Sequence, residues 1–189
     1  MDAFFDGDYR GDSPDGYGTY NDASGAKYTG VWKHGVLEGQ VYITFSSGDL
    51  YKGEWKNSNP YGQGVLINIY GERFEGNFIN GKLEGNASRN WPNGDSYLGE
   101  FVNGKMHGYG VKKFENGDIY KGEFENDKIH GKGLMIWNSG ESYDGQWEDG
   151  KENGKGTLIH IDQRYDGEFL NGLKHGLGTA TKYDAGTYE

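Results

Sequence analysis

The sequence predicts an all-β protein, an elongated single-layer twisted antiparallel meander of about eight β-hairpin repeats. Three features of the chain lead to this fold class. An aromatic-x-Gly-x-aromatic element recurs at intervals of 23 residues, a Gly-x-Gly element follows it in most copies, and turn-forming sequences separate the two. A fixed interval of this size is typical of repeat proteins, whose copies pack only against their neighbours.

The aromatic element marks the first strand of each repeat. Its first residues lie 23 apart five times and then 22 apart once, and the copies are Tyr28-x-Gly30-x-Trp32, Tyr51-x-Gly53-x-Trp55, Phe74-x-Gly76-x-Phe78, Tyr97-x-Gly99-x-Phe101, Tyr120-x-Gly122-x-Phe124, Tyr143-x-Gly145-x-Trp147 and Tyr165-x-Gly167-x-Phe169. Full repeats are therefore predicted to start at residues 28, 51, 74, 97, 120, 143 and 165, in a single array over residues 1–189. Tyr9-x-Gly11 predicts a shorter N-terminal repeat over residues 9–27, which has lost four residues from its turn around Pro14.

The Gly-x-Gly element marks the second strand. It occurs at Gly16/Gly18, Gly62/Gly64, Gly108/Gly110, Gly131/Gly133, Gly154/Gly156 and Gly176/Gly178. Val41 replaces its second glycine in one repeat, and Ala87 replaces it in another. Asn80-Gly81 and Asn103-Gly104 lie between the two strands of their repeats, and Asn-Gly between strand-forming residues is a strong hairpin signal. Each repeat is therefore predicted to be strand, turn, strand, turn.

Alternation along the strands predicts two unlike faces. In residues 51–55, Tyr51, Gly53 and Trp55 share one face, while Lys52 and Glu54 share the other. A glycine beside a ring gives that ring room to lie flat, because it has no Cβ. One face should therefore carry aromatic residues and glycines, and the opposite face should be polar.

Composition narrows the classes of function. The chain has 35 glycines, no cysteine, 29 aromatic residues (5 Trp, 15 Tyr and 9 Phe), a mean hydropathy of −0.90 and a net charge of −10. The high aromatic content argues against disorder, and the missing cysteines exclude disulfides and thiolate metal sites. An acidic surface disfavours binding to nucleic acid and to anionic lipid. The N-terminal residues show no secretion signal, and no apolar run reaches membrane-spanning length.

The sequence shows no catalytic constellation, so the protein is predicted not to be an enzyme and to need no cofactor or metal. His107, His130 and His175 occupy the same repeat position, which favours a structural role in the turns. Equivalent residues of successive repeats should lie roughly 9–10 Å apart, too far to share a metal ion. The carboxylates fall on the polar face or in turns, and the Gly-x-Gly elements lack the helix that follows a phosphate-binding loop.

The aromatic face has two compatible interpretations. Its rings pack on one another as the only core, and part of the face also stays open to accept a partner. We expect the partner to be an amphipathic helix or extended peptide, because Trp and Tyr dominate binding hot spots. The candidate groove residues are Trp32, Phe45, Trp55, Phe78, Trp91, Phe101, Phe114, Phe124, Trp137 and Trp147, with Trp91, Phe114 and Trp137 at its centre.

The repeat resembles the MORN (membrane occupation and recognition nexus) family. Residues 97–110, Tyr-Leu-Gly-Glu-Phe-Val-Asn-Gly-Lys-Met-His-Gly-Tyr-Gly, follow the family pattern nearly position by position, and the resemblance extends from about Tyr9 to Glu189. It implies an open twisted antiparallel sheet whose aromatic groove binds a partner helix or peptide. It also implies a scaffold in the cytoplasm, in a cytoskeletal, ciliary or membrane-proximal assembly, with a homodimer through the terminal repeats as a further option.

Two other functions stay open at this point. One is a membrane- or phospholipid-associated module, against which the acidic charge argues. The other is the targeting subunit of an enzyme complex whose catalytic site lies on a different chain. The departures from the family pattern, Ser58-Asn59-Pro60-Tyr61 and Asp127 among them, put local turn geometry in question and leave the fold unchanged.

Overall fold

The computed structural model describes residues 2–183, in which sixteen β-strands and no helix are found. The strands are β1 (Phe4–Arg10), β2 (Ser13–Asn21), β3 (Lys27–Lys33), β4 (Val36–Thr44), β5 (Leu50–Lys56), β6 (Asn59–Ile67), β7 (Arg73–Ile79), β8 (Lys82–Asn90), β9 (Ser96–Val102), β10 (Lys105–Lys113), β11 (Ile119–Glu125), β12 (Lys128–Ile136), β13 (Ser142–Glu148), β14 (Lys151–Ile159), β15 (Gln163–Leu170) and β16 (Leu173–Lys182).

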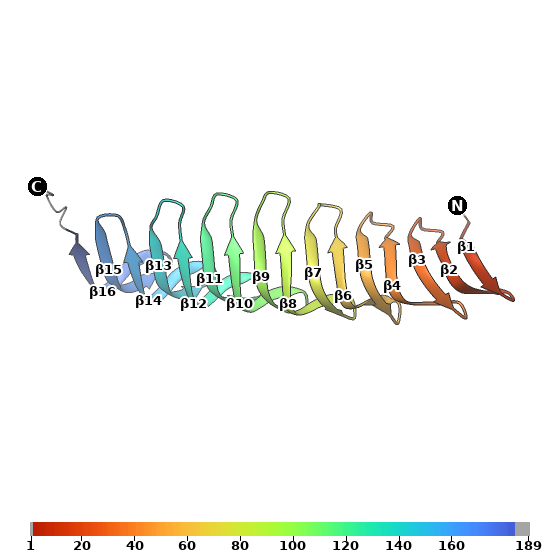
Figure 1. Ribbon diagram of the computed structural model, residues 1–189. Coiled ribbons are helices and arrows are strands. Elements are labelled where there is room, and N and C mark those ends of the chain that lie inside the picture. Colours follow the sequence, from red (N-terminus) through yellow and green to blue (C-terminus); the bar gives the residue numbers. More distant parts are fainter. Residues whose placement is uncertain (1, 184–189) are drawn as a thin grey trace, which may run out of the picture. The chain divides into compact units, whose positions relative to one another are not determined.

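The chain forms two compact units. The first takes the residues up to Pro92 together with Phe101–Gly104, and the second takes Asn93–Glu100 and the residues from Lys105 onward. Within each unit the strands follow sequence order in the sheet and pair antiparallel (Figure 1). The predicted fold class is confirmed, because successive strands form the hairpins of an all-β antiparallel meander.

Two-residue turns join the strands of each hairpin. Asn80 and Gly81 have φ values of 50° and 78°, the left-handed backbone of a type I′ turn, which matches the twist of paired strands. Asn57 and Ser58 keep this geometry with φ values of 50° and 60°, although the family pattern has glycine at the second position. Tertiary pairing therefore holds the turn shape where the sequence departs from the preferred Asn-Gly.

The first hairpin begins earlier than the sequence prediction placed it. Strand β1 already spans Phe4–Arg10, and Phe5 pairs with Tyr20 where later repeats have a tyrosine at the head of the strand. Gly7 pairs with Gly18, so the aromatic-x-Gly-x-aromatic element is residues 5–9 and not one that starts at Tyr9. The prediction aligned this repeat on Tyr9-x-Gly11, 19 residues before Tyr28, although Phe5-Asp6-Gly7-Asp8-Tyr9 keeps the interval of 23. No residues are missing from the turn, since Gly11 and Asp12 join two complete strands.

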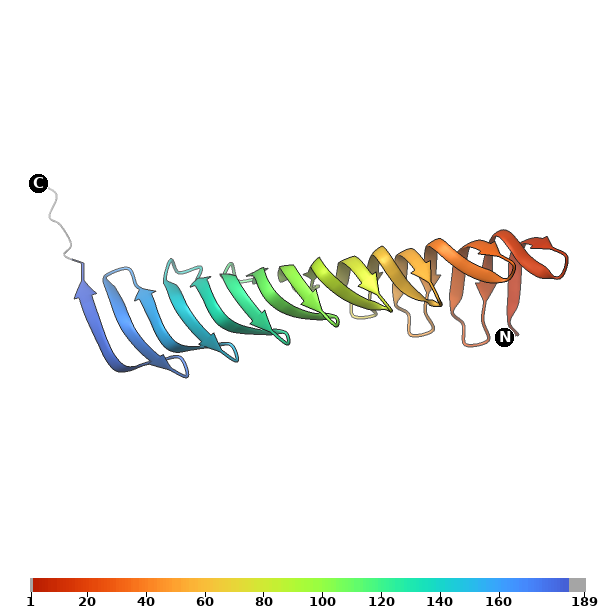
Figure 2. The ribbon, with the colours of Figure 1, turned by 90° about the horizontal axis from the view of Figure 1, so that it is seen from below.

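A β-bulge bends the hairpins β1–β2, β3–β4, β5–β6, β7–β8, β11–β12, β13–β14 and β15–β16. The register between β5 and β6 shifts between Gly53 and Trp55, and the hairpins β3–β4, β11–β12 and β13–β14 shift at the same repeat position. A bulge inserts an unpaired residue and bends the strand that carries it. Figures 1 and 2 show that the strands of both units are curved along their length. The curvature brings the aromatic side chains of one face toward one another.

A tyrosine ring lying over two paired glycines is the repeated unit of the core. The Tyr51 ring covers Gly53 and Gly64, which face each other across β5 and β6, and a methyl group on either glycine would overlap the ring. The Tyr51 hydroxyl donates to the carbonyl oxygen of Glu54, at 2.7 Å. Four further tyrosines do the same, namely Tyr97, Tyr120, Tyr143 and Tyr165, with donor–acceptor distances of 3.0, 3.1, 3.1 and 3.5 Å.

Four of these rings, those of Tyr51, Tyr97, Tyr120 and Tyr143, also pack edge-on against an aromatic residue of the following repeat. Ring centroids lie 4.9 Å apart for Tyr97 and Phe124, and 4.8 Å apart for Tyr143 and Phe169, with interplanar angles of 79° and 78°. Edge-to-face pairs of this kind contribute about 0.5–1.5 kcal/mol beyond the area that they bury. Interlocking rings thus join these repeats, and buried aliphatic side chains such as Leu83 and Met106 pack in the same core.

Burial changes the acidity of the tyrosines. It raises the pKa of Tyr51 and the pKa of Tyr143 to about 12, and it raises the pKa of Tyr97 and the pKa of Tyr120 still further. The charged phenolate loses its hydration in the core, so the neutral hydroxyl is favoured. The rings therefore stay neutral in the folded protein well above the pH at which tyrosine ordinarily ionises.

We predict that Gly133→Ala destabilises the protein. The new methyl group would overlap the Tyr120 ring on a strand whose backbone is otherwise compatible with alanine. Overpacking of this kind costs about 1–3 kcal/mol of unfolding free energy, measurable by urea denaturation. The neighbouring exposed substitution Lys132→Ala is the control and should change the unfolding free energy by less than about 0.5 kcal/mol. Equal effects of the two substitutions would contradict the ring-over-glycine core.

We also predict that the fold is lost in alkali between about pH 10 and pH 12. The folded pKa values of Tyr51 and Tyr143 lie above that of free tyrosine, so their contribution is complete below pH 10 and declines as the pH rises. Circular dichroism should fall together with the rise of phenolate absorbance. Tyr143→Phe should make the loss less dependent on pH, whereas Tyr70→Phe, at a residue 80% exposed, should leave it unchanged.

Candidate functional site

The ten aromatic residues predicted to line a groove divide into two groups. Five lie in the core at 6, 2, 1, 3 and 4% exposure, and they are Trp55, Phe78, Phe101, Phe124 and Trp147. Five are partly exposed, and they are Trp32, Phe45, Trp91, Phe114 and Trp137. The buried members belong to the interlocking ring packing, so a partner can reach chiefly the second group.

The ring packing is interrupted where Val41 replaces a glycine. Val41 faces Gly30 across β3 and β4, and its side chain, 5% exposed, fills the space that a tyrosine ring takes in other repeats. Tyr28 is therefore only half-buried, whereas Tyr51 of the next repeat is 0% exposed. Within the described residues the Tyr28 hydroxyl makes no hydrogen bond to a carbonyl. The substitution noted in the sequence thus displaces this ring outward.

A hollow of about 500 Å³ lies beside the displaced ring, on the face of the first unit that carries the aromatic rings and is called the ring face below. The aromatic residues that line it are Tyr20, Tyr28, Trp32, Phe45 and Trp55. Their ring centroids lie 6.1–6.4 Å apart, compared with 4.8–5.5 Å between the interlocked rings of successive repeats. The rings here border an opening that they do not fill. The structure thus brings three of the ten predicted residues together, and adds two tyrosines that the prediction did not include.

One carboxylate lies at the edge of this hollow. Asp22 is the only charged residue among those that line it. Its Oδ1 atom accepts hydrogen bonds from the Ser24 backbone and hydroxyl, at 2.8 and 2.6 Å, and from the Ala26 backbone, at 2.9 Å. The Ser24 hydroxyl bond is the main cause that lowers the pKa of Asp22. Burial, and then the nearby Asp22 charge, raise the pKa of Tyr28. Asp22 is therefore ionised and Tyr28 neutral at neutral pH.

A second interruption lies in the same unit, where Ala87 replaces a glycine. Ala87 faces Gly76, and the Phe74 ring at the head of that repeat is half-buried, as Tyr28 is. Here the opening is filled by the chain itself. The Arg89 guanidinium carbon lies 5.1 Å from the Phe74 ring centroid and 4.3 Å from that of Trp91.

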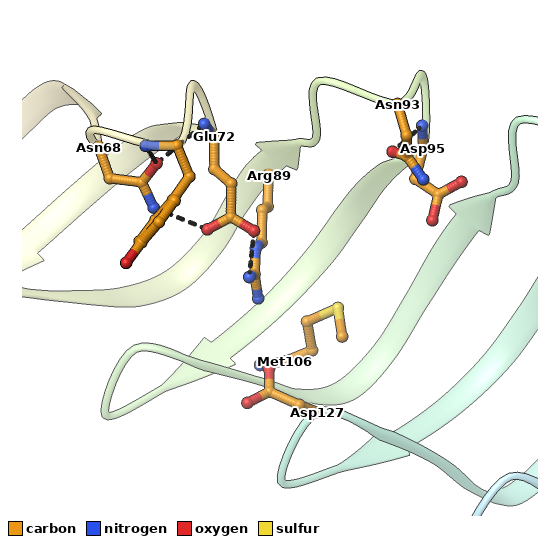
Figure 3. A network of polar contacts seen from close by, with 8 residues as sticks. Asn68, Glu72, Arg89, Asn93, Asp95, Met106 and Asp127 are labelled. Atoms are coloured by element: carbon orange, nitrogen blue, oxygen red, sulfur yellow. Dashed lines mark hydrogen bonds and ion pairs between the residues drawn. The ribbon is translucent and has the colours of Figure 1, made fainter.

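The Arg89 guanidinium is also paired with a carboxylate. Its Nη2 atom lies 2.9 Å from Oε1 of Glu72, and Asn68 donates to the other Glu72 oxygen at 2.8 Å (Figure 3). The Arg89 and Glu72 side chains are 20% and 19% exposed, so water screens the pair weakly. Two rings, one cation and one carboxylate therefore form a single partly buried cluster.

In the second unit the ring packing is uninterrupted beside the predicted residues. Phe114 and Trp137 are partly exposed, but Tyr120 and Tyr143 are 0% exposed and lie over their glycine pairs. The Lys112 ammonium lies 4.6 Å from the centroid of Phe114. Phe114 and Trp137 thus remain candidates for contact with a partner, on a part of the ring face where the ring packing is uninterrupted.

Aspartates in the turns between hairpins connect neighbouring repeats, a role that the sequence analysis missed. The Asp49 carboxylate accepts a hydrogen bond from the backbone of Ile69, 20 residues later, at 2.7 Å. Asp95 and Asp118 accept equivalent bonds at 2.8 Å. The signal was present in the sequence as a Gly-Asp pair that recurs in register with the repeat. These carboxylates serve the fold and are not candidates for chemistry.

The histidines do not gather into a metal site. Across residues 2–183, no group of three or more His, Cys, Asp or Glu side chains could hold a metal ion. The hydroxyls of Tyr97 and Tyr120 donate to the backbone carbonyls of His107 and His130 at 3.4 Å, a contact that any residue at this position could accept. In the same described part of the chain, no helix has the length and apolar character needed to cross a membrane.

Comparison with known families gives a match over most of the chain. The model of the MORN repeat matches residues 5–27, 28–49, 51–67, 74–96, 97–119, 120–142, 143–162 and 165–187. The first matched range starts at Phe5, in agreement with the position of β1. None of the curated proteins compared with the chain matches it.

Among solved structures, the chain is similar to the TCP domain of SAS-4 (dCPAP) of Drosophila melanogaster, determined in complex with a proline-rich motif of Ana2 (dSTIL). The identity is 11%, the match covers 88% of this chain and 90% of that one, and the TM-score is 0.46. A point mutant of the TCP10 domain of Danio rerio CPAP is matched at 10% identity over 89% and 90% of the two chains, with a TM-score of 0.29. Similarity at this level carries no information about function.

The Arg89 cluster predicts a difference in unfolding free energy between two arginine substitutions. Arg89→Leu should lower the unfolding free energy by about 1–3 kcal/mol, because it leaves the Glu72 carboxylate partly buried without its cation. Arg73→Leu is the matched control, since Arg73 pairs with Glu75 at 2.8 Å in the same strand but at 42% and 54% exposure. The control should lose less than about 1 kcal/mol, as exposed ion pairs do. Equal losses in urea unfolding would show that ring contact and burial add nothing to the Arg89 pair.

Proposed function

Because this chain belongs to the MORN repeat family, we propose that it is a non-catalytic scaffold that binds a segment of a partner protein on its ring face. The segment is an amphipathic helix or an extended peptide that places side chains between the exposed aromatic residues. Both modes use apolar anchors spaced along a secondary-structure element, which a row of rings can accept. As part of the same proposal, the complex belongs to a cytoplasmic assembly of cytoskeletal, ciliary or membrane-proximal type.

The hollow beside Tyr28 is the observation that carries this proposal. Its volume of about 500 Å³ lies within the roughly 300–1,000 Å³ range typical of pockets that take a ligand. Trp32 and Phe45 present partly exposed ring surface, and Trp55 forms a buried part of the lining. A pocket walled by large, rigid aromatic groups favours the insertion of a side chain from a partner, because such groups lose little conformational entropy on binding.

The chemistry of the lining supports binding over catalysis. The lining contains one charged residue, Asp22, and no lysine, histidine or arginine that could serve it as an acid–base partner. General acid–base and nucleophilic catalysis depend on titratable groups placed within hydrogen-bond reach of a substrate, and often on a second group that activates the first. The hollow therefore offers aromatic contact area and a single carboxylate.

Selection of peptides on the immobilised chain tests the proposal. A phage library of random 16-residue peptides should yield binders, and Phe45→Ala should weaken their binding by tenfold or more, measured by titration calorimetry. The reason is that truncating an aromatic anchor of a pocket typically costs more than about 1.4 kcal/mol of binding energy. Phe45 precedes a surface turn and is partly exposed, so its removal should leave the fold intact.

Tyr70→Ala is the control for this experiment. Tyr70 is 80% exposed in the turn before β7 and does not line the hollow, so its removal should leave the affinity unchanged. Failure to select any binder, or equal affinity of the selected peptides for the chain and for Phe45→Ala, would refute the proposed binding site.

A further inference from the structure

We propose that the hollow beside Tyr28 recognises a cation, the ammonium or guanidinium group of a lysine or arginine side chain in the partner segment. This inference rests on the proposed function and names the chemistry of the group that enters the site. It is drawn from the placement of one carboxylate, Asp22, at the edge of a hollow that is otherwise lined by five aromatic rings and by Gly35, Val36, Leu37 and Ser58.

The rings supply the first part of the recognition. An aromatic ring carries a negative face, and a cation within about 6 Å of its centroid is attracted to it. Tyr20 lies 6.3 Å from Tyr28 and 6.1 Å from Trp32, and Trp55 lies 6.3 Å from Tyr28 and 6.4 Å from Phe45, all measured between ring centroids. The five rings are therefore neighbours that line one hollow, so several can approach one ligand group together.

Asp22 supplies the second part. Its Oδ1 atom is held by the turn through Ser24 and Ala26, while Oδ2 has no hydrogen-bond partner within the described residues. The position of the carboxylate is therefore fixed by the fold, and one oxygen remains available to a ligand. At this position in the repeat the other described copies carry Phe45, Asn68, Trp91, Phe114, Trp137 and His160, so among them a carboxylate stands only beside Tyr28.

The chain itself shows what fills such an environment. At the second interruption, Arg89 lies against Phe74 and Trp91 and pairs with Glu72. Both openings combine a ring displaced by a missing glycine, an aromatic residue before the following turn, and a carboxylate from the preceding turn. In one of them the cation is part of the chain.

The hollow beside Tyr28 has no cation of its own. Arg89 lies opposite Phe74 in the pairing of β7 with β8. The residue that lies opposite Tyr28 in the pairing of β3 with β4 is Ile43, which is 0% exposed. No lysine or arginine is among the residues that line the hollow. An incoming ammonium or guanidinium group would therefore supply the one component that the Arg89 cluster has and this site lacks.

A neutral apolar group fits the site less well. It would displace water from the Asp22 carboxylate and offer no hydrogen bond or charge in return, which is costly for an ionised group. A lysine side chain satisfies both parts of the site, because its methylene stem packs on the rings while its charged end meets the carboxylate. The net charge of −10 on the whole chain further favours the approach of a basic segment.

Small amino-acid amides test the inference directly. The probes are the N-acetyl methylamides of lysine, trimethyl-lysine and arginine, with the neutral norleucine derivative for comparison. Binding is followed at the indole N–H signals of Trp32 and Trp55 in ¹⁵N-labelled full-length protein. We expect saturable shifts with the cationic probes, and an affinity for norleucine at least fivefold lower. The ranking of the three cations distinguishes a lysine, a methylated lysine and an arginine as the group recognised.

The substitution Asp22→Asn tests the contribution of the negative charge of the Asp22 carboxylate. Asparagine keeps an Oδ1 acceptor for Ser24 and Ala26, so the turn should fold as before. We expect this variant to lose the fivefold preference and to bind norleucine at least as well as the original chain does, because the cost of desolvating a carboxylate is removed. Asp49→Asn is the matched control, because Asp49 also occupies a turn but does not line the hollow, and it should retain the preference.

Two results would overturn the inference: equal affinity for lysine and norleucine probes, or a preference that persists in Asp22→Asn. Either of them leaves the proposed scaffold function standing if selected peptides still depend on Phe45. Loss of that dependence refutes the scaffold proposal instead, whatever the small probes show.

Discussion

The packing of a tyrosine ring over a pair of facing glycines is the constraint on which the rest of the structure depends. A single-layer sheet has no second layer to bury its apolar face, so the face must be covered by its own side chains. Gly53 and Gly64 lack a Cβ, which lets the Tyr51 ring lie flat on the backbone and reach a carbonyl with its hydroxyl. The bulge at the same place bends the strand around the ring. In the regular repeats the glycines, the tyrosine and the bulge therefore act together.

Loss of that packing in two repeats creates the surface features that suggest a function. Val41 and Ala87 each add a side chain where the ring would lie, and Tyr28 and Phe74 are displaced outward. One opening is closed by Arg89, and the other remains a hollow with a carboxylate at its edge. Breaks in a local rule of this kind are where binding sites are expected. In the regular repeats the aromatic side chains already pack on one another.

A second set of contacts, independent of the rings, keeps these irregular repeats in place. The backbone of a hairpin turn bonds to the preceding repeat, as Gly81 does to the carbonyl of Pro60 at 3.0 Å, and Gly104 does to that of Leu83. The turns at the other end are joined by carboxylates such as that of Asp49. Polar bonds at both ends of the strands hold the register, so one repeat can lose its ring packing without losing its place in the sheet.

The sequence by itself determined the repeat, its strands and turns, the two unlike faces and the two positions where a glycine is missing. These follow from periodicity and from the fixed alternation of side chains along a strand, which need no knowledge of distant contacts. Only the tertiary structure decided which rings are buried. Trp55 and Phe45 face the same way, yet Trp55 is core and Phe45 is partly exposed, because burial is set by neighbours on other strands. The same holds for Asp22, whose sequence position marks a turn and whose place beside five rings arises only when three hairpins fold together.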